Sequence, residues 1–96
     1  MEQPLMPDRL RVNPMTKTHH TLFADFMNAD PRGRVRLNCV GTVADLGTQG
    51  VELADGLPVT LTDGELEADG TAAYSTEERV WVAVIDWDAI REVAAA

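Results

Sequence analysis

Four acidic residues alternate with other residues in the second half of the chain, and carboxylates at this spacing can bind a cation or a basic partner: Asp63, Glu65, Glu67 and Asp69. Side chains alternate between the two faces of a strand, so all four carboxylates would lie on one face. Together with Gly70 they resemble the start of a calcium-binding loop, but Thr76 stands where such a loop needs a bidentate glutamate. The pattern predicts surface acids that pair with arginines, with a protein-binding patch and a metal site as the alternatives.

The charge of the chain is unevenly distributed. The formal net charge is −8; residues 41–96 contain two arginines and twelve acids, a net charge of −10, whereas residues 1–40 carry +2. An acidic surface repels a phosphate backbone, so we expect no nucleic-acid binding, and a protein partner would present a basic surface. If the four acids are paired within the fold, Arg34, Arg36 or Arg79 on adjacent strands would be their partners.

Three further residues are candidates for metal binding or nucleophilic chemistry: His19, His20 and Cys39. Adjacent histidines on a helix point in different directions and make a poor metal pair, so we predict solvated residues at a helix start. Cys39 falls on the apolar face of a predicted strand, where a free cysteine is usually an inert small hydrophobic residue. The sequence contains no phosphate-binding glycine loop, nucleophile elbow or pair of catalytic acids. We therefore expect no enzymatic activity, no cofactor and no metal.

Trp87 is the aromatic residue with the strongest claim to a binding role. It stands between Asp86 and Asp88, where we predict the junction of a strand and a helix. A large ring at such a junction most often closes the end of a core, and a ligand platform is the alternative. The candidate partner-binding surface therefore comprises Trp87 and the four alternating acids.

Length and composition predict one small soluble domain. A chain of 96 residues has room for a single hydrophobic core. No apolar run reaches the roughly 18 residues that cross a membrane, and the N-terminus lacks the order of a signal peptide. Cys39 is the only cysteine, so no internal disulfide can form. These features favour a cytoplasmic protein without membrane association, and a homodimer is left open.

The N-terminal third is predicted to contain an arm and a helix. Residues 1–17 contain three prolines and no sustained apolar period, which is typical of a mobile arm. From Thr18 onward, apolar residues follow helical spacing: Leu22, Phe23, Phe26 and Met27. Asp30 followed by Pro31 would end that helix, because proline disfavours helical geometry in the preceding residue. The folded domain should comprise residues 18–96.

The remainder of the chain predicts short strands joined by turns. Apolar and polar residues alternate in several segments, and Asp63-Gly64 is a strong hairpin signal. The predicted strands span residues 34–40, 57–62, 65–74 and 79–86, with a short extended piece at 51–53. The segment 42–46 is predicted as a helix of one to two turns, with a strand as the competitor. Asp86 or Asp88 would cap a closing helix.

These elements predict an α+β fold. We expect a small curved antiparallel sheet of four to five strands, SH3-like if it closes into a barrel, with an N-terminal helix and a short C-terminal helix. The strand at 79–86 is apolar on both faces and should be the central, most buried one. The predicted core consists of Val35, Leu37, Val59, Leu61, Trp81, Val82, Val84 and Ile85.

Several strings in the sequence resemble a small family of bacterial domains of unknown function. They are RLN at 36–38, GTVADL at 41–46, GVEL at 50–53 and WVAVIDWDAIR at 81–91. The resemblance implies no activity, ligand or site residue. The segment 56–83, with its short strands and acidic turn, also resembles part of an SH3-like barrel.

The leading functional hypothesis is a noncatalytic protein-binding or regulatory module that acts through an acidic sheet face. A metal-dependent protein or small enzyme that uses the 63–69 carboxylates is the second, and it requires these groups to converge in a concave site. A nucleic-acid mimic that occupies a basic groove is the third, and it requires carboxylates spaced like phosphates over an extended face.

Overall fold

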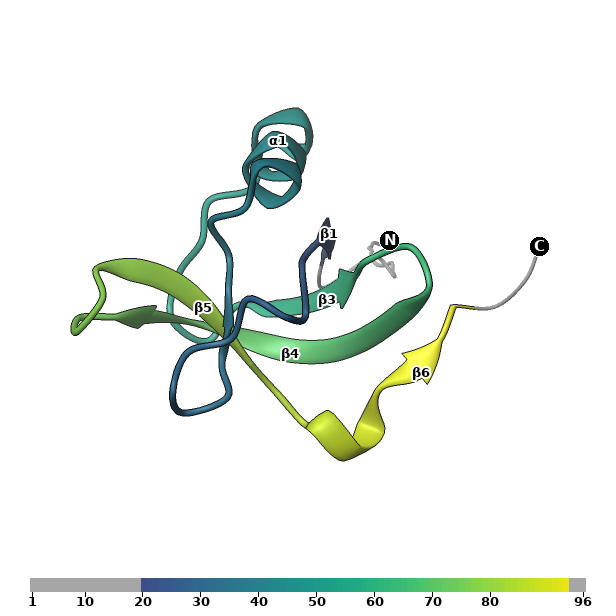
Figure 1. Cartoon of the computed structure of the whole chain (residues 1–96). Helices are drawn as coiled ribbons and strands as arrows, with labels where there is room; N and C mark the ends of the chain where they lie inside the picture. Colours follow the sequence, from purple (N-terminus) through teal and green to yellow (C-terminus); the bar gives the residue numbers. More distant parts are fainter. Residues whose placement is uncertain (1–19, 94–96) are drawn as a thin grey trace, which may run out of the picture.

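The computed structural model describes residues 20–93, and Figure 1 shows how their helices and strands are arranged. The elements follow one another as β1 (His20–Phe23), β2 (Val35–Arg36), α1 (Val40–Gln49), β3 (Pro58–Thr62), β4 (Leu66–Ser75), β5 (Val80–Ile85), the 3-10 helix η2 (Trp87–Ala89) and β6 (Arg91–Glu92). Within these residues no helix is long and apolar enough to cross a membrane. The predicted arm, residues 1–17, and His19 lie outside the described part of the chain.

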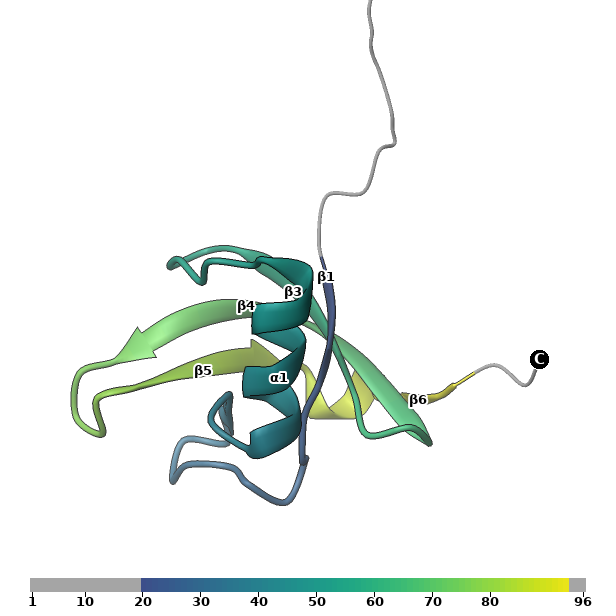
Figure 2. The same ribbon diagram turned by 90° about the horizontal axis from the view of Figure 1, so that it is seen from above.

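The strands form one mixed sheet in the order β1-β3-β4-β5-β2, and β6 pairs with β4. β1 runs parallel to β3, whereas the other pairs are antiparallel. α1 lies beside β1 in both views of the ribbon (Figures 1 and 2). The chain combines a helix with a sheet, as in an α+β fold, but the sheet has six strands and is mixed, not antiparallel as predicted. β1 and β2 are at opposite ends of an open sheet, which does not close into the SH3-like barrel.

β4, not β5, is the central strand of the sheet. Its ten residues pair with β3, β5 and β6, because the strand is long enough to cross all three. Most residues of the predicted core are buried or packed against the core. The prediction is wrong for Val84, which is 48% exposed. Val84 lies opposite Thr71, which is also exposed, so this face of the sheet is open to solvent at that point among the described residues.

The predicted N-terminal helix is wrong. Its apolar residues belong instead to β1 and the turn that follows, with burial alternating every second residue: Leu22, Ala24 and Phe26 are buried, whereas Phe23 and Met27 are exposed. Met27 is 91% exposed, so the helical stripe included a residue that makes no core contact. Burial in this segment therefore repeats every two residues, as in a strand, and not every 3.6 residues, as in a helix.

The sequence favoured a helix over a strand for this segment, and α1 is a helix, but it is longer than the predicted segment 42–46 at both ends. It starts directly after Cys39, which shortens the strand predicted at 34–40 to β2 and removes Cys39 from a strand face. Gly50 ends it with a left-handed φ of 66°, and its N–H donates to the Gly47 carbonyl. Thr42, the first residue of the predicted helix, lies inside α1 and is fully buried.

The predicted C-terminal helix is replaced by η2 and the short strand β6. Asp86 caps η2 as expected, because its side chain accepts a hydrogen bond from the Asp88 N–H at 2.9 Å. The chain then turns back to β4, where the Val93 N–H donates to the Glu65 carbonyl at 2.9 Å. Two residues of β6 are too few to give a sequence signal.

Candidate functional site

The four alternating acids do not all lie on one face. Glu67 and Asp69 are in β4, whereas Asp63 and Glu65 belong to the turn between β3 and β4. Asp63 Oδ1 accepts the N–H groups of Glu65 at 2.9 Å and Leu66 at 2.8 Å. These hydrogen bonds from Leu66 and Glu65 lower the pKa of Asp63, so its carboxylate stabilises the turn.

The acids of β4 are paired with an arginine that the sequence did not point to. Arg91 Nε donates to Glu67 Oε1 at 2.9 Å, and Arg91 Nη2 donates to Asp69 Oδ1 at 3.3 Å. Asp69 also accepts the Thr60 hydroxyl at 2.8 Å, across the β3–β4 pair. The hydrogen bonds to Asp69 and Glu67 raise the pKa of Arg91. Because Arg91 is in β6, its position could not be predicted without that strand.

The pairing of β6 with β4 brings a second group of acids to the same end of the sheet (Figure 1). Residues 63–69 and 86–92, which we name the acidic end, contain seven acids and one arginine, a net charge of −6. Asp86, Asp88 and Glu92 are candidate binding residues that sequence reasoning missed. Among the described residues, Glu65, Asp88 and Glu92 form no ion pair.

Trp87 belongs to the acidic end but also has a structural role. Its indole Nε1 donates to the Gly33 carbonyl at 2.7 Å, and its ring packs in a T-shaped arrangement with Phe26, with centroids 6.3 Å apart. Gly33 has a φ of 80°, and a Cβ there would lie 3.3 Å from the indole nitrogen. Trp87 therefore attaches the loop before β2 to η2, while 43% of it stays exposed.

The arginines predicted to pair with the acidic strand lie elsewhere. Arg34 and Arg36 bind acids of their own loop and of the β4–β5 turn, and Arg79 makes no ion pair with any described residue. Arg36 forms a double contact with Glu78, at 2.6 Å and 2.8 Å, and also donates to the Ala29 carbonyl. The Glu78 carboxylate raises the pKa of Arg36, and the hydrogen bond from Arg36 lowers the pKa of Glu78.

Asp30 is the most buried carboxylate of this second region, with 6% exposure. It accepts the N–H groups of Arg32 and Arg34 at 2.9 Å each and the Arg34 Nε at 2.8 Å. Burial alone would raise its pKa, but the hydrogen bonds from Arg34 and Arg32 outweigh that effect and hold the pKa below the usual value. Asp30 therefore both closes the loop and orients the Arg34 side chain.

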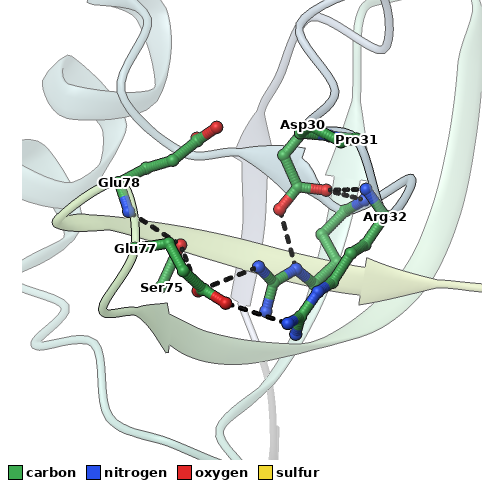
Figure 3. Close-up of a pocket in the computed structure, with 7 residues that line it drawn as sticks. Asp30, Pro31, Arg32, Ser75, Glu77 and Glu78 are labelled. Carbon is green, nitrogen blue, oxygen red and sulfur yellow. Dashed lines mark hydrogen bonds and ion pairs between the residues drawn. The ribbon is translucent and has the colours of Figure 1, made fainter.

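A small open pocket lies beside Asp30, between the loop 30–34 and the β4–β5 turn. Figure 3 shows its lining, and its volume is about 140 Å³. The lining residues are Asp30, Pro31, Arg32, Arg34, Ser75, Glu77 and Glu78. The sequence gives no signal for this pocket, because its two sides are more than 40 positions apart, as in the Arg32–Glu77 pair.

The remaining chemical candidates do not form a reactive site within the described residues. No group of three or more histidine, cysteine, aspartate or glutamate residues is placed to hold a metal ion in residues 20–93. The Cys39 sulfur lies 3.0 Å from the Thr42 hydroxyl at the start of α1, and His20 is exposed at the start of β1. The carboxylates at 63–69 thus form a turn and an arginine-paired strand, not a concave acid cluster.

No protein-family model, no curated protein sequence and no solved structure matches this chain. The resemblance to a family of small bacterial domains therefore stays a prediction from the strings quoted above.

Proposed function

We propose that this protein is a noncatalytic binding module that recognises a positively charged segment of a protein partner through its acidic end. The observation that carries the proposal is the concentration of charge: two paired segments contain seven acids and one arginine, Arg91. A basic segment would supply the counter-charge that these two segments lack, and such complementarity directs association.

The geometry of the acidic end supports a partner with an extended surface. Glu65 and Glu92 are exposed on the turn and on β6, and Asp88 is exposed on η2. Trp87, which precedes Asp88 in η2, adds an aromatic ring that is 43% exposed, and a lysine or arginine can stack on such a ring. The proposed binding surface therefore keeps Trp87, Glu65, Glu67 and Asp69 and adds Asp88 and Glu92.

The arrangement gives less support to the other two hypotheses. A metal-dependent activity needs several ligands directed at one point, and the described acids of the 63–69 segment bind N–H groups, a hydroxyl and a guanidinium instead. A nucleic-acid mimic needs evenly spaced carboxylates, whereas Asp63 is directed into a turn and Glu67 and Asp69 share Arg91.

The test compares single charge-neutralising variants for binding to proteins of the native host. We expect Glu65→Gln and Glu92→Gln to keep the fold and to bind a partner captured by the parent chain several-fold more slowly, with the defect shrinking as salt increases. After capture, the partner is purified and its association rate is measured by surface plasmon resonance at low and high sodium chloride.

Glu52→Gln is the matched control, because Glu52 is exposed, loses the same charge and lies outside the acidic end. Its association rate should stay close to that of the parent. Equal defects in all three variants would show a general charge effect, and a partner that binds the acidic-end variants as fast as the parent would rule out this surface.

A further inference from the structure

The pocket beside Asp30 contains a carboxylate that the chain itself supplies. The Glu77 side chain projects from the β4–β5 turn toward Arg32 (Figure 3), and it lies within ion-pair distance of both Arg32 and Arg34. Arg32 Nη2 lies 2.8 Å from Glu77 Oε2, and the Ser75 hydroxyl donates to Glu77 Oε1 at 3.4 Å. Ser75 is 1% exposed, so one polar group of this arrangement is almost fully buried.

Arg34 is held in place with part of its hydrogen-bonding capacity unused. Its Nε donates to Asp30, and only 16% of its side chain is exposed. Among the described residues, no acceptor hydrogen-bonds to its two terminal nitrogens, since Glu77 Oε1 is 3.9 Å from Nη2. A guanidinium has five N–H donors in a planar fork that fits an oxyanion, and buried donors require acceptors.

The Glu77 carboxylate only partly satisfies the hydrogen-bond donors that surround it in the pocket. Both contacts of its Oε1 are long, at 3.4 Å and 3.9 Å, and 57% of its side chain is exposed. The pocket of about 140 Å³ next to it has room for more than one water molecule, which takes about 30 Å³ in the liquid. A free oxyanion could therefore approach Arg34 and Ser75 more closely than a side chain anchored on the turn.

The neighbouring acids do not prevent an anion from binding. Asp30 is compensated by the Arg34 guanidinium and two backbone N–H groups, and Glu78 is bound by Arg36. When Glu77 leaves, Arg32 has no other ion-pair partner among the described residues, so the pocket gains a positive charge.

We propose that this pocket binds a small oxyanion, a carboxylate or a phosphate group, and that Glu77 is an internal substitute for it. The oxyanion would accept hydrogen bonds from the terminal nitrogens of Arg34, from Arg32 and from the Ser75 hydroxyl. The site is separate from the acidic end and takes a ligand of opposite charge, so it can be tested independently of the proposed function.

The experiment removes the internal carboxylate and measures oxyanion binding by the full chain. Glu77→Ala is titrated with sodium acetate and, separately, with sodium phosphate at constant ionic strength in chloride, and two-dimensional ¹H–¹⁵N spectra are recorded. We expect saturable shifts of the Arg34 Nε–H and of the backbone N–H groups of 75–79, with an affinity at least tenfold above that of the parent. Saturation by phosphate alone assigns a phosphate ligand, and saturation by acetate assigns a carboxylate.

Two further variants keep the proposal falsifiable. Glu65→Ala removes one exposed acid at the other end of the molecule and should gain no affinity, and Arg32→Ala in the Glu77→Ala background should lose the gain. The proposal is overturned if folded Glu77→Ala shows no saturable shifts with either anion, or if Glu65→Ala gains as much affinity. Should Glu77→Ala give a poorly dispersed spectrum, Glu77→Gln is titrated in the same way.

Discussion

At the scale of single residues, the described charges act mainly as local structural ties. Asp30 accepts backbone N–H groups of the loop before β2, and Asp63 does the same in the turn before β4. Asp86 caps η2. In each case a carboxylate accepts backbone N–H groups a few positions ahead, which is the geometry that favours aspartate in turns. Only Asp30 is also buried and ion-paired, so its charge contributes more to stability than the others.

We predict that Asp30→Asn lowers the free energy of unfolding by about 2–3 kcal/mol at neutral pH. Asparagine keeps an acceptor for the backbone N–H groups but leaves the partly buried Arg34 guanidinium with only the Glu77 carboxylate, at 3.9 Å, as a counter-charge. Because folding lowers the pKa of Asp30, its stabilisation is fully present above the unfolded value of about 3.9 and is lost as pH falls through the folded pKa.

Urea unfolding at several pH values checks this prediction. The difference between parent and Asp30→Asn should be constant above about pH 5 and should narrow as the pH falls below about 4. The exposed Glu52→Gln variant should differ from the parent by less than about 0.5 kcal/mol at neutral pH. A difference between parent and Asp30→Asn that is the same at pH 7 and pH 3 would contradict the assignment.

At the scale of elements, α1 protects the open edge of β1. The Thr42 hydroxyl donates to the Phe23 carbonyl at 2.6 Å, Asp45 accepts the Phe23 N–H at 2.7 Å, and Gln49 donates to the Thr21 carbonyl at 2.9 Å. Positions 42, 45 and 49 share one face of a helix. Side chains of α1 therefore replace the neighbouring strand that β1 lacks, which also blocks edge-to-edge pairing.

Thr42→Val tests this coverage, because valine keeps the shape of threonine and removes the hydroxyl. The Phe23 carbonyl would lose its buried donor, so we expect the free energy of unfolding to fall by about 1–2 kcal/mol. Thr48→Val, an exposed change in the same helix, should shift it by less than about 0.5 kcal/mol. Equal urea midpoints for the two variants would show that the hydrogen bond to β1 contributes little.

Elements with a strong local signal could be predicted from the sequence, and the others depend on contacts made in space. Alternating residues predicted β3, β4 and β5, and the segment 42–46 predicted the middle of α1. β1 could not be assigned, because its apolar residues fit two periods and its partner β3 lies more than 30 positions away. The pairing of Glu67 with Arg91 and the Glu77 pocket depend on such distant contacts, so no local pattern reveals them.

At the scale of the whole molecule, like charges outnumber their compensating partners. The described residues 20–93 contain fourteen acids and five arginines, and four of these arginines already form ion pairs within the fold. Negative charge is concentrated at the acidic end, whose two segments contain seven acids and one arginine, Arg91. Repulsion there opposes the pairing of β6 with β4, so the ionic strength should influence both stability and partner binding.

We predict that Arg91→Gln destabilises the protein in a salt-dependent way. The change removes two ion pairs with β4 and increases the charge of the acidic end, which should cost about 1 kcal/mol in dilute buffer. In 1 M sodium chloride, where the screening length is about 3 Å, at least half of this loss should disappear. Thermal unfolding at both ionic strengths measures the effect, and hydrogen exchange should show faster exchange of the Val93 N–H, which bonds to Glu65.

Arg79→Gln is the matched control, because it removes the same charge from an arginine that makes no ion pair with the described residues. If Arg79→Gln shows the same salt-dependent loss, the effect belongs to the net charge and not to the junction of β4 and β6.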